Sequence, residues 1–156
     1  MTTTSATTAD AADDGAGGGK LTPAEADGIL AGNFAPWVRE LGLSVVGTGE
    51  RHAVLRLPWS ERLAREGGGL SGQAMAAAAD TAAAIAVCAA LGGFAPMTTV
   101  QLSTTFQRAA RGTDLLVTAR LTKLGRRVAF VDVALTAPDA PEEPVAHATA
   151  VYAFPG

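Results

Sequence analysis

The segment Gly67–Gly92 constrains the fold of this chain more than any other part of the sequence. From Gln73 to Leu91 it consists largely of alanine, the best helix former, and glycines flank both ends. These features predict one helix, about 28 Å long at about 1.5 Å per residue. A helix that is apolar on all sides is normally buried, so we expect the rest of the chain to surround it.

Asp80 is the only charged residue between Gly72 and Leu91. A buried carboxylate is costly unless it is paired, hydrogen-bonded or protonated. Asp80 could cap a second helix that starts at Thr81, or be a structural residue satisfied by a nearby hydroxyl. A transmembrane helix is disfavoured, because alanine is only weakly apolar and Asp80 lies in mid-span.

The functional interpretation is that the Asp80 carboxylate faces a pocket and acts as a base or a nucleophile. Gln73 lies seven residues earlier, on the same face of the predicted helix. Two polar side chains therefore share one stripe of an otherwise apolar helix, which favours this interpretation.

The length of 156 residues predicts a single domain. Residues 1–21 are rich in Thr, Ala, Asp and Gly and predict a disordered tail, so the domain spans residues 22–156. Thr22 and Glu25 have the spacing of a capping box, which predicts a short helix. We expect Asn33 to cap a second short helix.

Six segments have the alternation of β-strands. They are Leu43–Val46, Ala53–Leu57, Thr98–Phe106, Leu115–Leu124, the segment through Ala129–Leu135, and Val145–Phe154. In the third of them, strict alternation places Thr99 and Gln101 on the face opposite to Leu102. Short links between the last four segments predict an antiparallel meander. A sheet of about six strands curling around one helix is an α+β fold.

Composition excludes several classes of function. The net charge is −3, so no basic excess points to nucleic acid. The single cysteine, Cys88, rules out an internal disulfide and fits a reducing cytosol. His52 and His147 do not combine with Cys88 in a metal-ligand spacing. No secretory signal is visible, and we expect a cytoplasmic protein without a membrane partner.

The sequence Leu70-Ser71-Gly72-Gln73, followed by Ala79-Asp80-Thr81-Ala82, resembles the hotdog-fold acyl-CoA thioesterases of the phenylacetate-degradation type, which are relatives of 4-hydroxybenzoyl-CoA thioesterase. The segment from Thr99 to Leu102 and the hairpin Leu124–Arg127 strengthen the resemblance. That family usually has His-Gly-Gly, with an acidic residue nine positions after the His. Here Ser71 replaces the His and Gln73 the second Gly, and Arg65 stands where Asn is frequent.

The resemblance implies a hotdog fold and hydrolysis of an acyl-CoA thioester, with no metal and no cofactor. Asp80 would act as general base or nucleophile, and the backbone N–H of Gly72 would hold the oxyanion at a helix N-terminus. Gln73 would orient the acyl group or water, and Thr99 would place a hydroxyl at the site. Family members complete the site across a dimer interface, so a homodimer or a dimer of dimers is expected.

Candidate substrate-binding residues follow from the same resemblance. They are Ser71 near the thioester, Thr98 beside Thr99, Arg65 at the family's Asn position, and Arg108, Arg126 and Arg127 for the phosphates of coenzyme A. Ser71 could equally be the helix N-cap, and each arginine could be a solvated surface charge. We expect the size of the acyl pocket to depend on Trp59, Leu63, Met75 and Phe106.

Two alternatives stay open beside the thioesterase. A hotdog dehydratase is disfavoured, because that chemistry uses a His and the long predicted helix has none. A non-catalytic hotdog protein that binds acyl-CoA or lipid is the stronger alternative, because Ser71 and Arg65 depart from the family's pattern.

Overall fold

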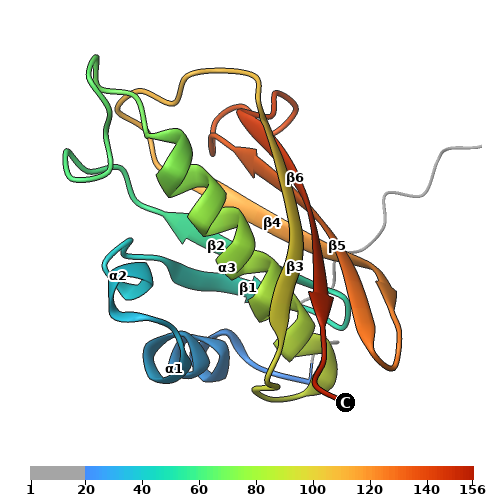
Figure 1. Ribbon diagram of the computed structural model, residues 1–156. Coiled ribbons are helices and arrows are strands. Elements are labelled where there is room, and N and C mark those ends of the chain that lie inside the picture. The colour runs from blue at the N-terminus through green and yellow to red at the C-terminus, as the bar shows by residue number, and fades with distance from the viewer. Residues whose placement is uncertain (1–19) are drawn as a thin grey trace, which may run out of the picture.

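One antiparallel sheet of six strands curves around a long central helix, α3, in the computed structural model, which describes residues 20–156 (Figure 1). The strand order is β1-β2-β4-β5-β6-β3. This is the predicted α+β hotdog fold. The elements are α1 (Pro23–Asn33), α2 (Pro36–Arg39), β1 (Ser44–Thr48), β2 (His52–Leu57), α3 (Gly72–Leu91), β3 (Thr98–Phe106), β4 (Leu115–Leu124), β5 (Val128–Thr136) and β6 (Ala146–Ala153).

Helix α3 is continuous, so Asp80 does not cap a second helix. The Ser71 side chain caps its start by accepting a hydrogen bond from the backbone N–H of Ala74, and Gly92 ends it with a left-handed φ of 84°. Although α3 has the length and apolar composition of a membrane-spanning helix, 13 of its 20 residues are buried in the fold. It is the core helix of the domain.

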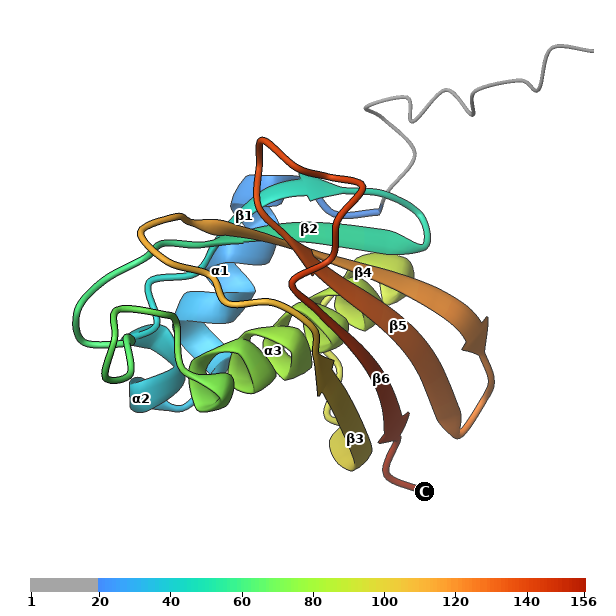
Figure 2. The same ribbon diagram turned by 90° about the horizontal axis from the view of Figure 1, so that it is seen from above.

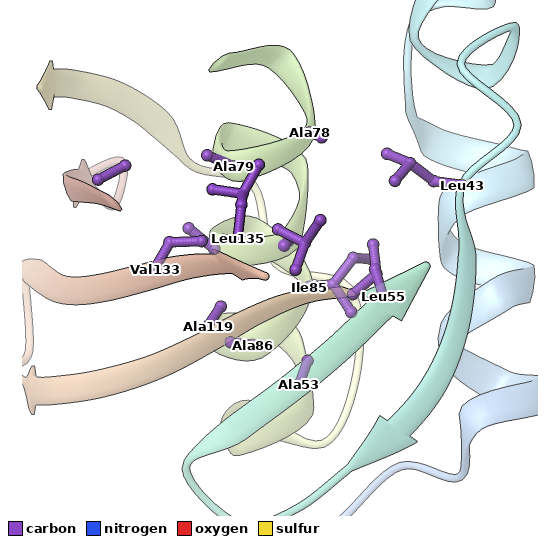
Figure 3. Packing of buried hydrophobic residues seen from close by; sticks show 14 of the residues in the cluster. Leu43, Ala53, Leu55, Ala78, Ala79, Ile85, Ala86, Ala119, Val133 and Leu135 are labelled. Atoms are coloured by element: carbon purple, nitrogen blue, oxygen red, sulfur yellow. The ribbon is translucent and has the colours of Figure 1, made fainter. Parts of the chain in front are cut away.

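Alanine lets the sheet approach α3 closely, because its side chain adds only one carbon beyond the backbone. Figure 3 shows Ile85 of α3 between Leu55 of β2 and Leu135 of β5, with alanines on either side. All three of these larger side chains are fully buried. The core therefore forms where the concave face of the sheet meets the helix.

The N-terminal helices follow the predicted pattern in part. The capping box of Thr22 and Glu25 is confirmed, with reciprocal hydrogen bonds of 2.8 and 3.2 Å. The predicted cap at Asn33 is wrong: Asn33 ends α1, and its side-chain amide donates to the carbonyl of Ile29. Ala35 precedes α2 and has no side-chain acceptor to cap it, and Pro36 takes the first helical position, where no intrahelical N–H bond is made.

The predicted disordered tail, residues 1–21, falls mainly on residues 1–19, which lie outside the described residues. At its end, Leu21 is buried, and its carbonyl accepts a hydrogen bond of 2.7 Å from the Thr48 hydroxyl. Leu21 therefore belongs to the folded body.

The predicted four-strand meander is wrong for β3. Strands β4, β5 and β6 do follow one another in the sheet, but β3 pairs with β6 instead of β4. The segment after β3 crosses the end of the sheet, where the N–H of Gln107 donates to Val145 and the N–H of Leu70 donates to Ala110. These contacts hold the crossover and place β3 at the far edge.

Strand β3 lies beside β6 at one of the two edges of the sheet, opposite to the edge formed by β1 (Figure 2). Eight of its nine residues are exposed, including three large apolar ones: Val100 (57%), Leu102 (37%) and Phe106 (46%). A long, apolar, unpaired edge is what another strand would pair with.

Asp114, just before β4, ties the end of β2 to the loop that leads to α3. Its carboxylate accepts a hydrogen bond of 2.9 Å from the backbone N–H of Trp59 and pairs with Arg56 at 2.7 Å. The Trp59 N–H, and then Arg56, hold the pKa of Asp114 below its ordinary value of 3.8. A carboxyl whose pKa is lower when folded stabilises the fold above its unfolded pKa, and that stabilisation disappears as the pH falls through the folded pKa.

We therefore expect Asp114→Asn to lower the free energy of unfolding at neutral pH by at most about 1 kcal/mol, since the ion pair is partly exposed. The difference from wild type should shrink as the pH falls below 3.8. Urea unfolding at several pH values measures it, with Asp139→Asn in an exposed loop as control. An equal loss at every pH would contradict this role for the Asp114 charge.

Candidate active site

The Asp80 carboxylate is held by two hydroxyl groups from neighbouring strands. Its Oδ1 accepts a hydrogen bond of 2.9 Å from Thr99 Oγ1 at the start of β3. The hydroxyl of Tyr152, near the end of β6, contacts both Oδ1 and the backbone carbonyl of Asp80. Oδ2 makes no hydrogen bond with any residue that the structure describes. One oxygen is thus fixed in place and the other is available for chemistry.

A β-bulge at Val100 directs Thr99 toward Asp80. Thr99 pairs with Tyr152 across β3 and β6, whereas Gln101 pairs with Val151, so the register shifts by one residue between them. Strict alternation would have placed Thr99 on the outer face with Gln101. A bulge inserts one extra residue and re-aims the side chains before it, which corrects the predicted orientation of this strand.

Tyr152 is a site residue that the sequence analysis did not identify. It lies on the inner face of β6, is 2% exposed, and is the only tyrosine in the chain. Burial raises the pKa of the Tyr152 phenol far above its ordinary value, and the negative charge of Asp80 raises it further. Tyr152 therefore stays protonated and donates a hydrogen bond at neutral pH. A buried tyrosine usually needs a hydrogen-bond partner. The one sequence signal for this contact is therefore a tyrosine on the apolar face of the last predicted strand.

Asp80, Thr98, Thr99 and Tyr152 line a cavity of about 640 Å³. The rest of its wall is mostly apolar and comes from the α1–α2 region, from α3, from the loop before β3 and from the C-terminal end of β6. Its larger side chains are Phe34, Trp37, Val38, Phe94, Met97 and Phe154. The four side chains predicted to shape the pocket do not line it, because all four lie near the other end of α3.

Gly72 lies in a different cavity from Asp80. Together with Arg65, Phe106 and Arg108, it lines a space of about 350 Å³ at the start of α3. As the first residue of the helix, it has a backbone N–H with no partner inside the helix. Eight residues of helix separate it from Asp80, which is about 12 Å. Within one chain, the predicted oxyanion donor and the predicted base therefore do not meet.

Ser71 and Gln73 are also separated from Asp80. Ser71 is the N-cap of α3, accepting a hydrogen bond of 3.1 Å from Ala74, so the capping interpretation holds for its side chain. Gln73 is exposed beside it, in a third cavity.

The four candidate arginines form two groups. Arg65 and Arg108 line the cavity of Gly72, and Arg108 lies 3.9 Å from Glu143. Arg126 and Arg127 are exposed in the turn between β4 and β5. The carbonyl of Arg127 accepts a hydrogen bond from Phe154, which lines the Asp80 cavity. Residues 20–156 contain no cluster of three or more His, Cys, Asp or Glu that would hold a metal ion.

Comparison with known proteins assigns the family. Residues 67–143 match the profile of the thioesterase superfamily. The structure of a protein assigned as a thioesterase from Silicibacter sp. TM1040 is 34% identical, covers 87% of this chain and 93% of that chain, and has a TM-score of 0.77. The chain belongs to the thioesterase superfamily. The sequence resemblance is thus confirmed for the superfamily, and the phenylacetate-degradation type stays a prediction.

Two further solved structures show how far the similarity in sequence and fold extends. Thioesterase superfamily member 2 from zebrafish is 25% identical, covers 86% of this chain and 99% of that chain, and has a TM-score of 0.73. A thioesterase from Haemophilus influenzae has the same fold at 18% identity, with a TM-score of 0.70 over 80% of this chain and 84% of that chain. No curated protein sequence matches this thioesterase-superfamily chain at a significant level.

Alkaline titration tests the contact between Tyr152 and Asp80, since the chain has one tyrosine and phenolate absorbance reports it alone. We expect no phenolate near the ordinary pKa of 10.0, and ionisation only at much higher pH. Asp80→Asn removes the neighbouring negative charge, so the phenolate of that variant should appear at lower pH than in wild type. Ionisation of wild-type Tyr152 near its ordinary pKa would contradict the contact.

Proposed function

We propose that this thioesterase-superfamily protein hydrolyses acyl-CoA thioesters with Asp80 as general base or nucleophile. The observation that carries the proposal is the position of Asp80. Its carboxylate lies at a largely apolar cavity, two hydroxyls hold Oδ1, and Oδ2 has no hydrogen bond to any residue between 20 and 156. The spacing from Ser71 to Asp80 supports placing it with the phenylacetate-degradation type.

In the proposed reaction, Oδ2 of Asp80 takes a proton from a water molecule as that water attacks the thioester carbonyl carbon. The C–S bond then breaks, the coenzyme A thiolate leaves with the proton that Asp80 took up, and the free acid remains. Direct attack by Oδ2 is the second route. It breaks the C–S bond and leaves an acyl–Asp80 anhydride, which water then hydrolyses to the free acid, with the water's proton going to the thiolate. Thr99 and Tyr152 act as positioning residues, because they fix the carboxylate through Oδ1.

The oxyanion donor comes from a second copy of the chain in this proposal. A reacting carbonyl must lie about 3 Å from its oxyanion donor and either about 3 Å from its nucleophile or one water molecule away from its base. The Gly72 of the same chain is about 12 Å from Asp80 along the helix, which is too far. A site built from one chain alone would lack the donor.

The exposed edge of β3 provides a way to supply it. Thr99 contacts Asp80, and a Cβ placed on Gly72 would lie 3.4 Å from the ring of Phe106, so the two ends of β3 mark the two half-sites. If two copies pair antiparallel through β3 with Thr99 opposite Phe106, each Asp80 faces the Gly72 of the other copy. The same pairing covers Val100 and Leu102, which are exposed in the single chain. We therefore propose a homodimer, which could pair further into a tetramer.

This dimer would also bring Arg65 and Arg108 of one copy to the Asp80 cavity of the other, since both line the cavity of Gly72. Arg65 and Arg108 are therefore better candidates than Arg126 and Arg127 for binding the phosphates of coenzyme A. Arg126 and Arg127 lie in the turn beside Phe154 and offer a second cationic region on the same chain as Asp80.

Asp80→Asn tests the chemistry directly. Asn keeps a side-chain oxygen that can accept from Thr99 and Tyr152 but cannot accept a proton from water, so we expect kcat to fall by about 10²–10⁴-fold. Release of free thiol from a panel of acyl-CoAs measures it, with Asp132→Asn on the exposed face of β5 as a matched control. Equal activity of Asp80→Asn and wild type would refute the mechanism, and inactivity of wild type on every acyl-CoA would favour the binding-protein alternative.

Gly72 offers a pair of variants that isolates the backbone N–H. Proline suits the first position of a helix, and Ser71 before it has the extended backbone that proline requires, so Gly72→Pro should fold while deleting the donor. Loss of one oxyanion donor typically costs about 10²–10³-fold in kcat. Gly72→Ala keeps the N–H, its Cβ is in ordinary contact with Phe106, and it should stay within a few-fold of wild type.

Mixing the two inactive variants then tests the shared site. After joint refolding, a dimer of one Asp80→Asn chain and one Gly72→Pro chain contains one intact site, so activity should recover to roughly a quarter of wild type by random pairing. No recovery in a mixture that demonstrably forms mixed dimers would place both groups in the same chain's site.

A further inference from the structure

The Asp80 cavity follows one stripe of α3 toward its C-terminal end. The helix contributes Ala77, Asp80, Ala84 and Cys88 to its wall, each about one helical turn after the previous one, with Thr81 beside them. Asp80 is the only charged side chain of the lining. Beyond Asp80, the helix wall consists of small side chains, so the cavity continues as a channel along the helix surface.

The far end of this channel is covered by the loop between α3 and β3. Cys88 is buried, and Ala95 of that loop lines the same cavity. Burial raises the pKa of the Cys88 thiol, so it stays neutral and is an apolar surface for a ligand. Phe94 and Met97 of the same loop, and Phe154 after β6, complete the apolar surroundings.

The length of the channel can be compared with that of an acyl chain. Eight helical residues from Asp80 to Cys88 span about 12 Å. An extended alkyl chain advances about 1.3 Å per methylene for a C–C bond of about 1.5 Å, so roughly nine carbons fit between the two residues. A thioester held at Asp80 would thus place the end of a chain of that length at Cys88.

We propose that the substrate carries a straight, medium-length acyl chain of about eight to ten carbons, and that Ala84 determines this specificity. The inference rests on the proposed hydrolysis at Asp80, since it takes the thioester to lie there. An arylacetyl group is about half as long and would leave the Cys88 end unfilled, losing contacts with its walls.

Ala84 is the specificity-determining residue because it lies midway along the channel. It is four residues from both Asp80 and Cys88, and it is 8% exposed at the cavity wall. A larger side chain here would block the channel about 6 Å from Asp80, which leaves room for only four or five carbons. Shorter chains would still reach Asp80.

The test is a chain-length profile of kcat/KM for acetyl- to tetradecanoyl-CoA and phenylacetyl-CoA, with wild type, Ala84→Val and Ala84→Leu. We expect wild type to prefer acyl chains of eight to ten carbons. Below that length, kcat/KM should rise about fourfold with each added methylene. Ala84→Leu should lose on the order of a thousandfold with decanoyl-CoA, because about five methylenes lose their contacts, and stay within a few-fold of wild type with butyryl-CoA. Ala84→Val should shift the chain-length preference less. It replaces Ala84→Leu in the test if the leucine variant does not fold.

Ala90→Leu is the matched control, because Ala90 is half-buried on the last turn of the same helix and is not part of the cavity lining. It should leave the chain-length preference unchanged. Hydrolysis with no length preference, a preference for phenylacetyl-CoA, or Ala84 variants that lose activity equally on all chains would overturn the inference and leave the proposed hydrolysis standing.

A binding measurement separates this inference from failure of the proposed function. If wild type hydrolyses no acyl-CoA, the hydrolysis proposal fails, and calorimetry with S-ethyl-CoA and S-decyl-CoA thioethers decides the channel. Tighter binding of the decyl thioether, lost in the Ala84 variants, would uphold it. Equal affinity for the two thioethers would overturn it.

Discussion

The burial of α3 is the constraint on which the rest of the structure depends. A helix this rich in alanine has little side-chain surface of its own, so its burial is favourable only if the sheet comes close and encloses it along most of its length. That close approach places Asp80 against β3 and β6, where the hydroxyl groups of two strands reach its carboxylate. The same packing that stabilises the domain therefore produces a carboxylate with a defined orientation.

The free edge of the sheet links this constraint to chemistry. Because β3 crosses over to pair with β6, its first residues lie beside Tyr152 and not beside β4. The bulge at Val100 then turns Thr99 inward, so that two strands which are distant in sequence each place a hydroxyl on one oxygen of Asp80. Without the crossover, Thr99 would not lie beside Tyr152 and would not reach Asp80.

The features that the sequence predicted are local ones. Helix α3 and strands β3 and β4 were placed within one residue, since alanine content, flanking glycines and alternating apolar residues act over a few positions. The capping box at Thr22 is equally local. The pairing of β3, the bulge and the contact of Tyr152 depend on tertiary packing, and no spacing in the sequence encodes them. Of the predicted site residues, the structure brings Asp80, Thr98 and Thr99 together at the Asp80 cavity. The four arginines and Gly72 do not line that cavity.

The separation of Gly72 from Asp80 shows how a helix can serve a symmetric site. The two groups lie about 12 Å apart on one rigid element, so no side-chain motion within a chain brings them together. In the proposed dimer, a two-fold axis beside the midpoint of β3 would reverse the direction of α3 in the second copy. The Gly72 end of one helix would then lie beside Asp80 of the other. In such an arrangement the distance within one chain becomes the spacing between two equivalent sites. The alanine helix would then set the geometry of both sites at once, and the exposed apolar strand would hold them in register.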